Sequence, residues 1–381
     1  MALNRPRVAF DVTPLQNAHR VRGIGRYVDG LARALLAQRE VPIEFWGWHD
    51  DRPFEVRAPH RGLWLRRFGM PRTRWSWVLG PLGMRLRARM SAVEAAHITD
   101  PRAFTPLRLA TLTTVYDLIP LLDPSTGPGR DLRAYRRWLR RLASARGIFA
   151  ISRQTADDLK AHLGIPPPPV WIAPPGVTVA PAHSPSPSTG EGRGGGAASE
   201  PPYFLYVGSA DPHKNLALLL EAFDRSASLP ERLLLVGPWY GNDVFALERR
   251  LARQPGLRGR VEYRGFVEEV RLQALFREAT AVVVPSRREG FGLPVAEAMA
   301  AGGIVLHSRI PVLEEISQGA ALTFDPGSPE ELTACLQRVS TDAPLRQRLR
   351  LEGARRASSL GWEAGLAATL DAYRAVISLT L

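Results

Sequence analysis

The sequence of 381 residues contains one cysteine, Cys335, and only two lysines, Lys160 and Lys214. A single cysteine excludes an internal disulfide and a zinc site built mainly from cysteines. The apolar runs are too short to cross a bilayer as a helix, and the first residues carry no signal-peptide pattern. We therefore expect a soluble cytoplasmic protein.

Metal-binding patterns are also missing. The chain has no Asp-x-Asp motif and no cluster of His, Asp and Glu at the spacing that ligands of one ion require. We expect no metal and no cofactor.

Positive charge is abundant, with a formal net charge of +13 and an isoelectric point near 10.7, and it comes almost wholly from arginine. One cluster lies between Arg61 and Arg89, contains no acidic residue and is interleaved with aromatic residues. A second lies between Arg130 and Arg146. Its spacing marks one face of a helix, which carries Arg133, Arg137, Arg140 and Arg141.

Three interpretations of these two arginine clusters are open. Cationic faces with aromatic residues suit an anionic bilayer, which would make the protein peripheral at the inner face of the plasma membrane. They also suit nucleic-acid phosphates, although no helix-turn-helix, zinc finger or RNA-binding motif supports a nucleic-acid partner. A solvated arginine face without a partner is the third interpretation.

Short apolar strands alternate with amphipathic helices twice along the chain, which indicates parallel sheets built from strand-helix-strand units. We expect an α/β protein with two doubly wound, Rossmann-like domains facing across a cleft. The expected strands are residues 8–12, 111–118, 147–152, 203–208, 233–238, 261–266 and 281–284, and a helix is expected from residue 22 to about 38.

The domain boundaries follow from composition. Residues 180–200 are rich in proline, glycine and serine and predict a flexible tether. It separates a first domain, residues 1–179, from a second, residues 201–358. Residues 359–381 are expected to form a final helix.

Residues 285–302 combine a strand exit, a glycine loop, a helix start and two carboxylates. Helix-start amides lack intrahelical partners and carry partial positive charge, so a diphosphate suits them. Glu289 is expected in the loop and Glu297 inside the helix, where they would contact different parts of one extended ligand. A plain strand-loop-helix turn is the alternative.

The segment from Glu289 to Glu297 resembles the Glu-x7-Glu signature of family-4 retaining glycosyltransferases, which are glycosyl transferases of group 1, many of them mannosyltransferase-like, with the GT-B fold. The resemblance implies that Glu289 contacts the donor sugar and Glu297 the ribose. It also implies sugar or phosphate contacts from the amides of Gly290, Phe291, Gly292 and Leu293.

Other segments resemble further parts of this family. Residues 22–28 are similar to its first-domain glycine loop, which places Gly23 and Gly25 near the donor diphosphate or the acceptor. Residues 211–216 are similar to its phosphate-binding turn, with Lys214 as the phosphate cation; a solvated loop lysine is the alternative. The expected donor-binding set also includes Ser209, Phe266 and Val267. By the same resemblance, the first domain is the acceptor side, the second binds the donor nucleotide, and the final helix packs back on the first domain.

The chain departs from the family pattern at three positions. Tyr116 stands where many members have histidine; it is expected to line the sugar pocket, but a phenol does not titrate near neutrality. Ser209 stands where some members have arginine, and His213 replaces the first residue of a common Arg-Lys pair. Candidate substitutes for the missing phosphate cations are Arg22, Arg26 and Arg287.

The resemblance implies a retaining, metal-independent enzyme that moves a hexose, such as mannose, from a nucleotide-diphosphate sugar to a glycan or lipid-linked acceptor in cell-surface polysaccharide synthesis. The expected catalytic residues are Lys214, Glu289 and Tyr116, and the sugar nucleotide is a co-substrate rather than a cofactor. The departures at Tyr116 and Ser209 suggest an alternative, a catalytically silent relative that binds nucleotide or glycan as a scaffold. A nucleic-acid binder is suggested by the isoelectric point alone.

Overall fold

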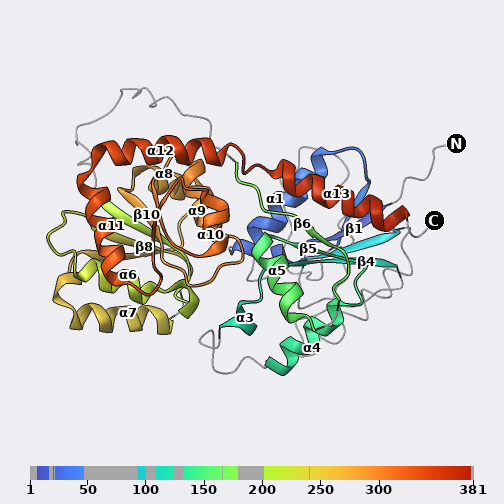
Figure 1. Ribbon diagram of the computed structural model, residues 1–381, viewed down its shortest axis with the longest axis horizontal. Coiled ribbons are helices and arrows are strands. Elements are labelled where there is room, and N and C mark those ends of the chain that lie inside the picture. Colours follow the sequence, from blue (N-terminus) through green and yellow to red (C-terminus); the bar gives the residue numbers. More distant parts are fainter. Residues whose placement is uncertain are drawn as a thin grey trace. The chain divides into compact units, whose positions relative to one another are not determined.

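The computed structural model describes residues 7–16, 20, 22–46, 93–99, 109–123, 132–164, 166–178, 201–239 and 241–378. The chain divides into two compact units, which are coloured by sequence in Figure 1. Unit 1 contains residues 1–176 and 362–381, and unit 2 contains residues 177–361. The expected tether at 180–200 and the arginine cluster between Arg61 and Arg89 lie outside the described residues, as does Arg130.

Unit 1 is built on a parallel sheet of six strands in the order β2-β1-β3-β4-β5-β6. The strands are β1 (Val8–Asp11), β2 (Ile43–Trp46), β3 (Ala95–Ile98), β4 (Ala110–Val115), β5 (Gly147–Ala150) and β6 (Val170–Ile172). The helices are η1 (Thr13–Gln16), α1 (Gly23–Ala37), α3 (Ile119–Leu122), α4 (Leu132–Leu142), α5 (Arg153–His162) and the C-terminal α13 (Trp362–Ser378).

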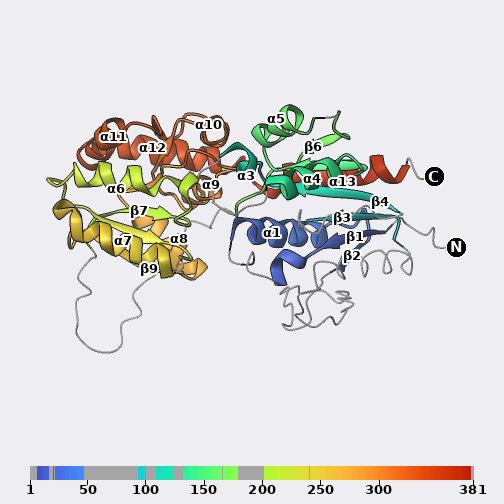
Figure 2. The same cartoon turned by 90° about the horizontal axis from the view of Figure 1, so that it is seen from below.

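The C-terminal helix α13 belongs to unit 1 because glycines let it pack closely there. It contacts α1, and a Cβ added to Gly30 of α1 would lie 1.9 Å from the Trp362 ring. A Cβ at Gly365 of α13 would lie 2.3 Å from the carbonyl oxygen of Pro174. In Figure 2 the red helix α13 runs alongside the strands of unit 1, and it contacts β3, β5 and β6 of the sheet as well as α1.

His97 on β3 is buried in the core of unit 1. Its Nδ1 lies 2.8 Å from the hydroxyl of Tyr373 on α13, and its Nε2 lies 2.7 Å from Oγ1 of Thr114 on β4. Burial lowers the pKa of His97 from its usual value to about 3, because the imidazolium would lose its hydration there. The neutral ring therefore links the sheet to the C-terminal helix.

We predict that His97 makes unit 1 less stable at acidic pH. The unfolded chain binds a proton at His97 as the pH falls through about 6.5, whereas the folded pKa of about 3 keeps the native ring neutral. The contribution of His97 to the free energy of unfolding is fully present above the unfolded pKa. It is lost progressively as the pH falls toward the folded pKa, at roughly 1 kcal/mol per pH unit.

Urea unfolding of wild type and His97→Gln at pH 7, 6, 5 and 4 tests this prediction, because the other titrating groups are common to both proteins. The stability difference between them should shrink as the pH falls, since glutamine does not titrate. A difference that stays constant from pH 7 to pH 4 would contradict it.

Unit 2 contains a second parallel sheet of six strands, in the order β12-β11-β10-β7-β8-β9. The strands are β7 (Tyr203–Val207), β8 (Arg232–Val236), β9 (Val261–Gly265), β10 (Ala281–Val284), β11 (Val305–Ser308) and β12 (Leu322–Phe324). The helices are η4 (Pro212–Lys214), α6 (Leu216–Asp224), α7 (Gly241–Arg253), η5 (Pro255–Leu257), α8 (Glu269–Glu278), α9 (Leu293–Ala300), α10 (Pro311–Ser317), α11 (Pro329–Thr341) and α12 (Ala343–Ala357).

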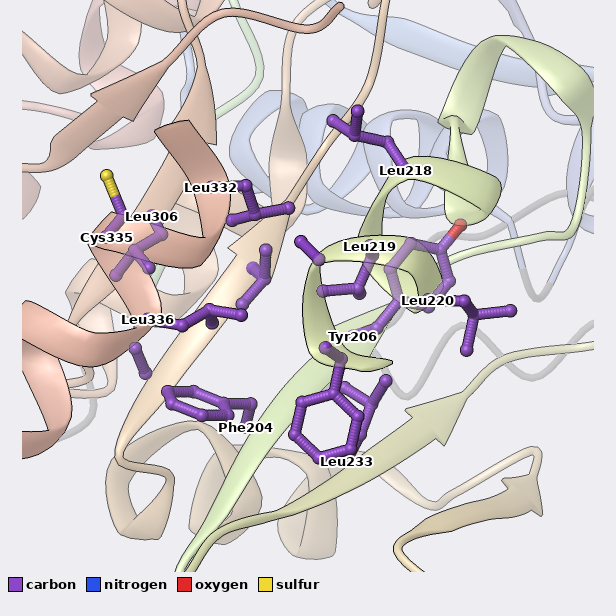
Figure 3. Packing of buried hydrophobic residues seen from close by; sticks show 14 of the residues in the cluster. Phe204, Tyr206, Leu218, Leu219, Leu220, Leu233, Leu306, Leu332, Cys335 and Leu336 are labelled. Atoms are coloured by element: carbon purple, nitrogen blue, oxygen red, sulfur yellow. The ribbon is translucent and has the colours of Figure 1, made fainter. Parts of the chain in front are cut away.

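Helices lie on both faces of this sheet, with α6 and α7 on one side and α8 and α9 on the other (Figure 1). Apolar side chains of α6 and α11 pack together over β7 and β8. In Figure 3 the Tyr206 ring lies beside Leu219 and Leu220, with its oxygen directed away from Phe204. This packing fixes the end of β7, which leads into the candidate site.

The two parallel sheets confirm the expected α/β fold with two doubly wound units. The expected helix at 22–38 is confirmed as α1, and the arginine spacing at 133–141 is confirmed as helical by α4. The expected strand at 111–118 ends at Val115 instead. The chain turns there because the Asp117 carboxylate accepts a hydrogen bond from the amide of Ile119, at 2.9 Å, and starts α3.

Candidate functional site

Lys214 and Glu289 lie at the topological switch point of the unit 2 sheet. The strand order places β7 beside β10, and the chain leaves these two neighbouring strands in opposite lateral directions. Lys214 lies in the loop after β7, and Glu289 lies in the loop after β10. In doubly wound sheets, ligands bind at this point, outside the carboxyl ends of the strands.

The two side chains form an ion pair. Nζ of Lys214 lies 2.7 Å from Oε1 and 2.8 Å from Oε2 of Glu289. The lysine side chain is 21% exposed and the glutamate side chain 7%, so the pair is mostly shielded from water. Sequence analysis gave these residues separate roles, with phosphate and with sugar. The structure shows that they are direct partners of each other.

Ser286, which sequence analysis missed, is the second partner of Glu289. Its Oγ donates to Oε1 of Glu289 at 2.7 Å, and the residue is 1% exposed. The sequence feature that could have identified Ser286 is its place three residues before Glu289 and just after an apolar strand.

The loop after β7 is fixed by aromatic side chains. The Tyr206 hydroxyl donates to the carbonyl oxygen of Ser209 at 2.6 Å, and Nε1 of Trp239 donates to that of Gly208 at 2.8 Å. Burial, and then the negative charges of Glu289 and Asp211, raise the pKa of Tyr206, so the phenol keeps its proton. The loop is therefore preorganised before any ligand arrives.

Ser209 does not supply the positive charge of the arginine found there in some relatives. Its hydroxyl donates to Oδ2 of Asp211 at 2.6 Å, within the same loop. The loop is also tied to the other strand end, because the amide of Arg287 donates to the carbonyl oxygen of His213 at 2.8 Å. The side chain of Arg287 is exposed beside this tie, so it can serve as a further cation.

Glycine conformation shapes the start of α9, which follows Glu289. Gly292 is the N-cap, with φ of 100°, and a Cβ there would lie 2.4 Å from Leu313. The N-cap glycine has no side chain with which to cap the helix, and the first turn contains no acidic residue. The partial positive charge at the helix start is therefore open to an anion.

The remaining expected donor residues of unit 2 occupy distinct places. Gly290, Phe291 and Leu293 flank Gly292, and the Phe291 side chain is buried. Glu297 lies on α9 and is half-buried. Phe266 and Val267 follow β9, which β8 separates from β7, and Phe266 is 55% exposed. Their contacts with a donor stay predictions.

The expected site residues of unit 1 lie at helix and strand ends of that unit. Gly23 begins α1, and Gly25 is buried in its first turn. Tyr116 directly follows β4 and is only 6% exposed; its hydroxyl donates to the carbonyl oxygen of Thr99 at 3.0 Å. The ring of Tyr27 packs edge-on against it, with centroids 5.5 Å apart. A role for Tyr116 in a sugar pocket stays a prediction.

Asp11 is a buried carboxylate that sequence analysis did not single out. It ends β1, beside the end of β3, where strand order changes direction in unit 1. Its side chain accepts from the Thr13 amide at 2.9 Å and from the Thr99 amide at 3.1 Å. These bonds explain its burial, since both donors stabilise the charged form. Within the described ranges, no group of three or more His, Cys, Asp or Glu side chains is placed to hold a metal ion.

Two family models match this chain, one in each half of the sequence. The model of Glycosyltransferase Family 4 matches residues 21–180, and that of Glycosyl transferases group 1 matches residues 192–356. The chain belongs to glycosyltransferase family 4. Its two parallel sheets are the two domains of the GT-B fold, and Lys214 and Glu289 lie within the group 1 match.

Curated relatives of this family-4 chain include O-antigen chain mannosyltransferase B of Escherichia coli, 31% identical over 177 residues, covering 45% of each chain. A second is the D-inositol 3-phosphate glycosyltransferase of Xylanimonas cellulosilytica, 32% identical over 246 residues, covering 61% of this chain and 57% of the relative. The matched part thus spans about half the length of these relatives.

Solved structures share the fold along the whole chain. Sucrose-phosphate synthase from Thermosynechococcus elongatus has a TM-score of 0.77 at 21% identity, covering 98% of this chain and 100% of its own. HepE of Anabaena, solved in complex with UDP and glucose, has a TM-score of 0.66 at 16% identity, covering 97% of this chain and 100% of its own. At these identities the likeness shows the fold alone.

Proposed function

We propose that this protein is a retaining glycosyltransferase that moves a hexose from a nucleotide-diphosphate sugar to a hydroxyl of a glycan or lipid-linked acceptor in cell-surface polysaccharide synthesis. One observation carries the proposal: Lys214 and Glu289 are paired at the switch point of the unit 2 sheet, next to an uncapped helix start. A cation and helix amides suit the diphosphate, and a carboxylate suits sugar hydroxyls. The E. coli O-antigen mannosyltransferase among the relatives supports mannose as the hexose.

The geometry suggests how the reaction would proceed. The bond between the sugar anomeric carbon and the diphosphate oxygen breaks, and the acceptor oxygen bonds to that carbon on the same face. The acceptor proton passes to the leaving phosphate oxygen. Lys214 and the amides at 290–293 would stabilise the charge that develops on the diphosphate, so the proposed step needs no metal. Glu289 would orient the sugar and Glu297 the ribose.

A thermal-shift screen with UDP, GDP, ADP and TDP and their common sugar conjugates tests the donor site without an acceptor. Since a ligand that binds the native state stabilises it, one nucleotide should raise the melting temperature clearly. Release of the diphosphate from the matching sugar conjugate then separates an enzyme from a silent scaffold, which would bind without turnover. A folded sample that responds to no nucleotide would contradict the proposal.

We also propose that the acceptor side of unit 1 docks on an anionic membrane through α4. The helix contains five arginines, Arg133, Arg136, Arg137, Arg140 and Arg141, and no acidic residue, and all five are exposed. Buried Leu139 and Leu142 hold its other face on the core. No helix in the described part of the chain is long and apolar enough to cross a membrane.

The vesicle prediction uses Arg136, Arg140 and Arg141, whose side chains make no hydrogen bond or ion pair within the described residues; the Ser144 bonds to Arg141 go to its backbone carbonyl. The variant Arg136→Ser, Arg140→Ser, Arg141→Ser should bind vesicles with 30% phosphatidylglycerol roughly a hundredfold more weakly than wild type, because each cation near the lipid contributes about 1 kcal/mol. A matched control removes the same charge from unit 2 by Arg249→Ser, Arg253→Ser and Arg355→Ser. Equal flotation of wild type with anionic and neutral vesicles would contradict membrane docking.

A further inference from the structure

The hydrogen bond from Ser286 gives Glu289 an anchor that is independent of Lys214. Ser286 follows β10 after Pro285, and its Oγ donates to Oε1 of Glu289 at 2.7 Å. The next amide in the chain, that of Arg287, is bonded to the carbonyl oxygen of His213. The backbone that carries Ser286 is therefore held both by the sheet and by the loop of Lys214.

The carboxylate of Glu289 has few partners within the described part of the chain. Lys214 contacts both oxygens, and Ser286 contacts Oε1. Since the glutamate side chain is only 7% exposed, water replaces a lost partner poorly. Once Lys214 turns to another partner, the Ser286 hydroxyl is therefore the one of these two donors that still holds the carboxylate.

A bound diphosphate competes with Glu289 for Lys214. An ammonium has three donors on a flexible stem, and the phosphate oxygens carry more charge than one carboxylate. When Lys214 turns toward the diphosphate, the neutral hydroxyl of Ser286 has no comparable attraction to it and stays with Glu289. Oε2 then remains as an acceptor for a sugar hydroxyl.

We propose that Ser286 is a positioning residue that holds Glu289 in its sugar-binding orientation once Lys214 has engaged the diphosphate. The inference rests on the proposed function. It assigns to Ser286 the selection of the sugar part of the donor, and leaves binding of the diphosphate part to Lys214 and the helix start.

Isothermal titration tests this role of Ser286. Wild type and Ser286→Ala are titrated with GDP-mannose and with GDP, and with UDP-glucose and with UDP, so that each sugar nucleotide is compared with its bare diphosphate. The preference of wild type for the sugar nucleotide over the bare diphosphate should fall roughly fivefold in the variant, the effect of one hydrogen bond. Affinity for the bare diphosphate should change less than twofold. The rate of diphosphate release from the sugar nucleotide should fall in parallel.

Two variants separate positioning from folding. Ser286→Thr keeps the hydroxyl and should restore the sugar preference. Ser226→Ala removes another buried serine hydroxyl of unit 2, which donates to the carbonyl oxygen of Ala222 at 2.8 Å, and should leave the preference unchanged.

Two results would overturn the inference while leaving the proposed function intact: an unchanged sugar preference in Ser286→Ala, or an equal loss of sugar nucleotide and bare diphosphate. If folded wild type binds neither class of ligand, the proposed function itself fails, and the inference fails with it.

Discussion

Lys214→Ala is expected to lower the rate of glycosyl transfer by roughly two to three orders of magnitude, as loss of one charge-stabilising donor does at comparable sites. The lysine lies in the loop after β7, which presents its ammonium 2.7 Å from Glu289. Its removal takes away a cation for the leaving diphosphate. It also leaves the Glu289 charge in a shielded position, where it repels the phosphate.

The chain offers a matched control for this substitution in Lys160, the other lysine. Its side chain is 62% exposed and lies 3.5 Å from Asp157 on the same helix of unit 1. Lys160→Ala removes the same charge from an exposed surface and should leave transfer and diphosphate binding unchanged. A general effect of net charge would instead weaken both variants equally.

Two measurements report the effect of Lys214→Ala on turnover and on diphosphate binding. The first is the rate of diphosphate release from GDP-mannose and UDP-glucose, and the second is the melting temperature with and without GDP or UDP. Lys214→Ala should fold and yet lose most of the stabilisation by the diphosphate. Wild-type turnover in the folded Lys214→Ala protein would rule out the lysine as the phosphate cation.

The sequence predicted the fold well where apolar runs coincide with strands. The expected strand at 281–284 is confirmed as β10, and the glycine loop and proline-containing helix start that follow it are confirmed by α9. Short strands such as β3 and β12 were not predicted. His97 interrupts the apolar pattern of β3, and its complete burial and its bonds to Thr114 and Tyr373 show that it is a core residue.

The candidate site was predictable only in part, because local motifs do not report contacts between distant segments. Lys214 and Glu289 were each identified from their own loops, but their pairing depends on β7 and β10 being neighbours. Likewise, the bond between Tyr116 and Thr99 depends on the pairing of β3 with β4. Ser286 was close in sequence to Glu289, yet serine is common in loops, and only its burial and its 2.7 Å bond distinguish it.

Glu289→Gln is expected to change binding and transfer in opposite directions. The substitution keeps the size of the side chain and an oxygen that can accept from Ser286, but it removes the charge that holds Lys214. Since a partly shielded ion pair of this kind contributes about 1 kcal/mol, the freed lysine should bind bare GDP or UDP several-fold more tightly. Transfer should nevertheless fall at least tenfold, because an amide oxygen is a weaker acceptor for sugar hydroxyls than a carboxylate.

A double-mutant cycle tests whether the tighter diphosphate binding comes from loss of the ion pair. GDP and UDP are titrated into wild type, Glu289→Gln, Lys214→Ala and the double variant. The tighter binding of Glu289→Gln should disappear when Lys214 is also replaced, because no ammonium is then left to be freed. Weaker diphosphate binding by Glu289→Gln would mean that the carboxylate holds the ammonium in its binding position instead of competing for it. Tighter diphosphate binding together with slower transfer would show that Glu289 has two roles. Before the diphosphate binds, its carboxylate neutralises the phosphate cation, Lys214. Binding of the diphosphate to Lys214 then releases Glu289 to orient the sugar.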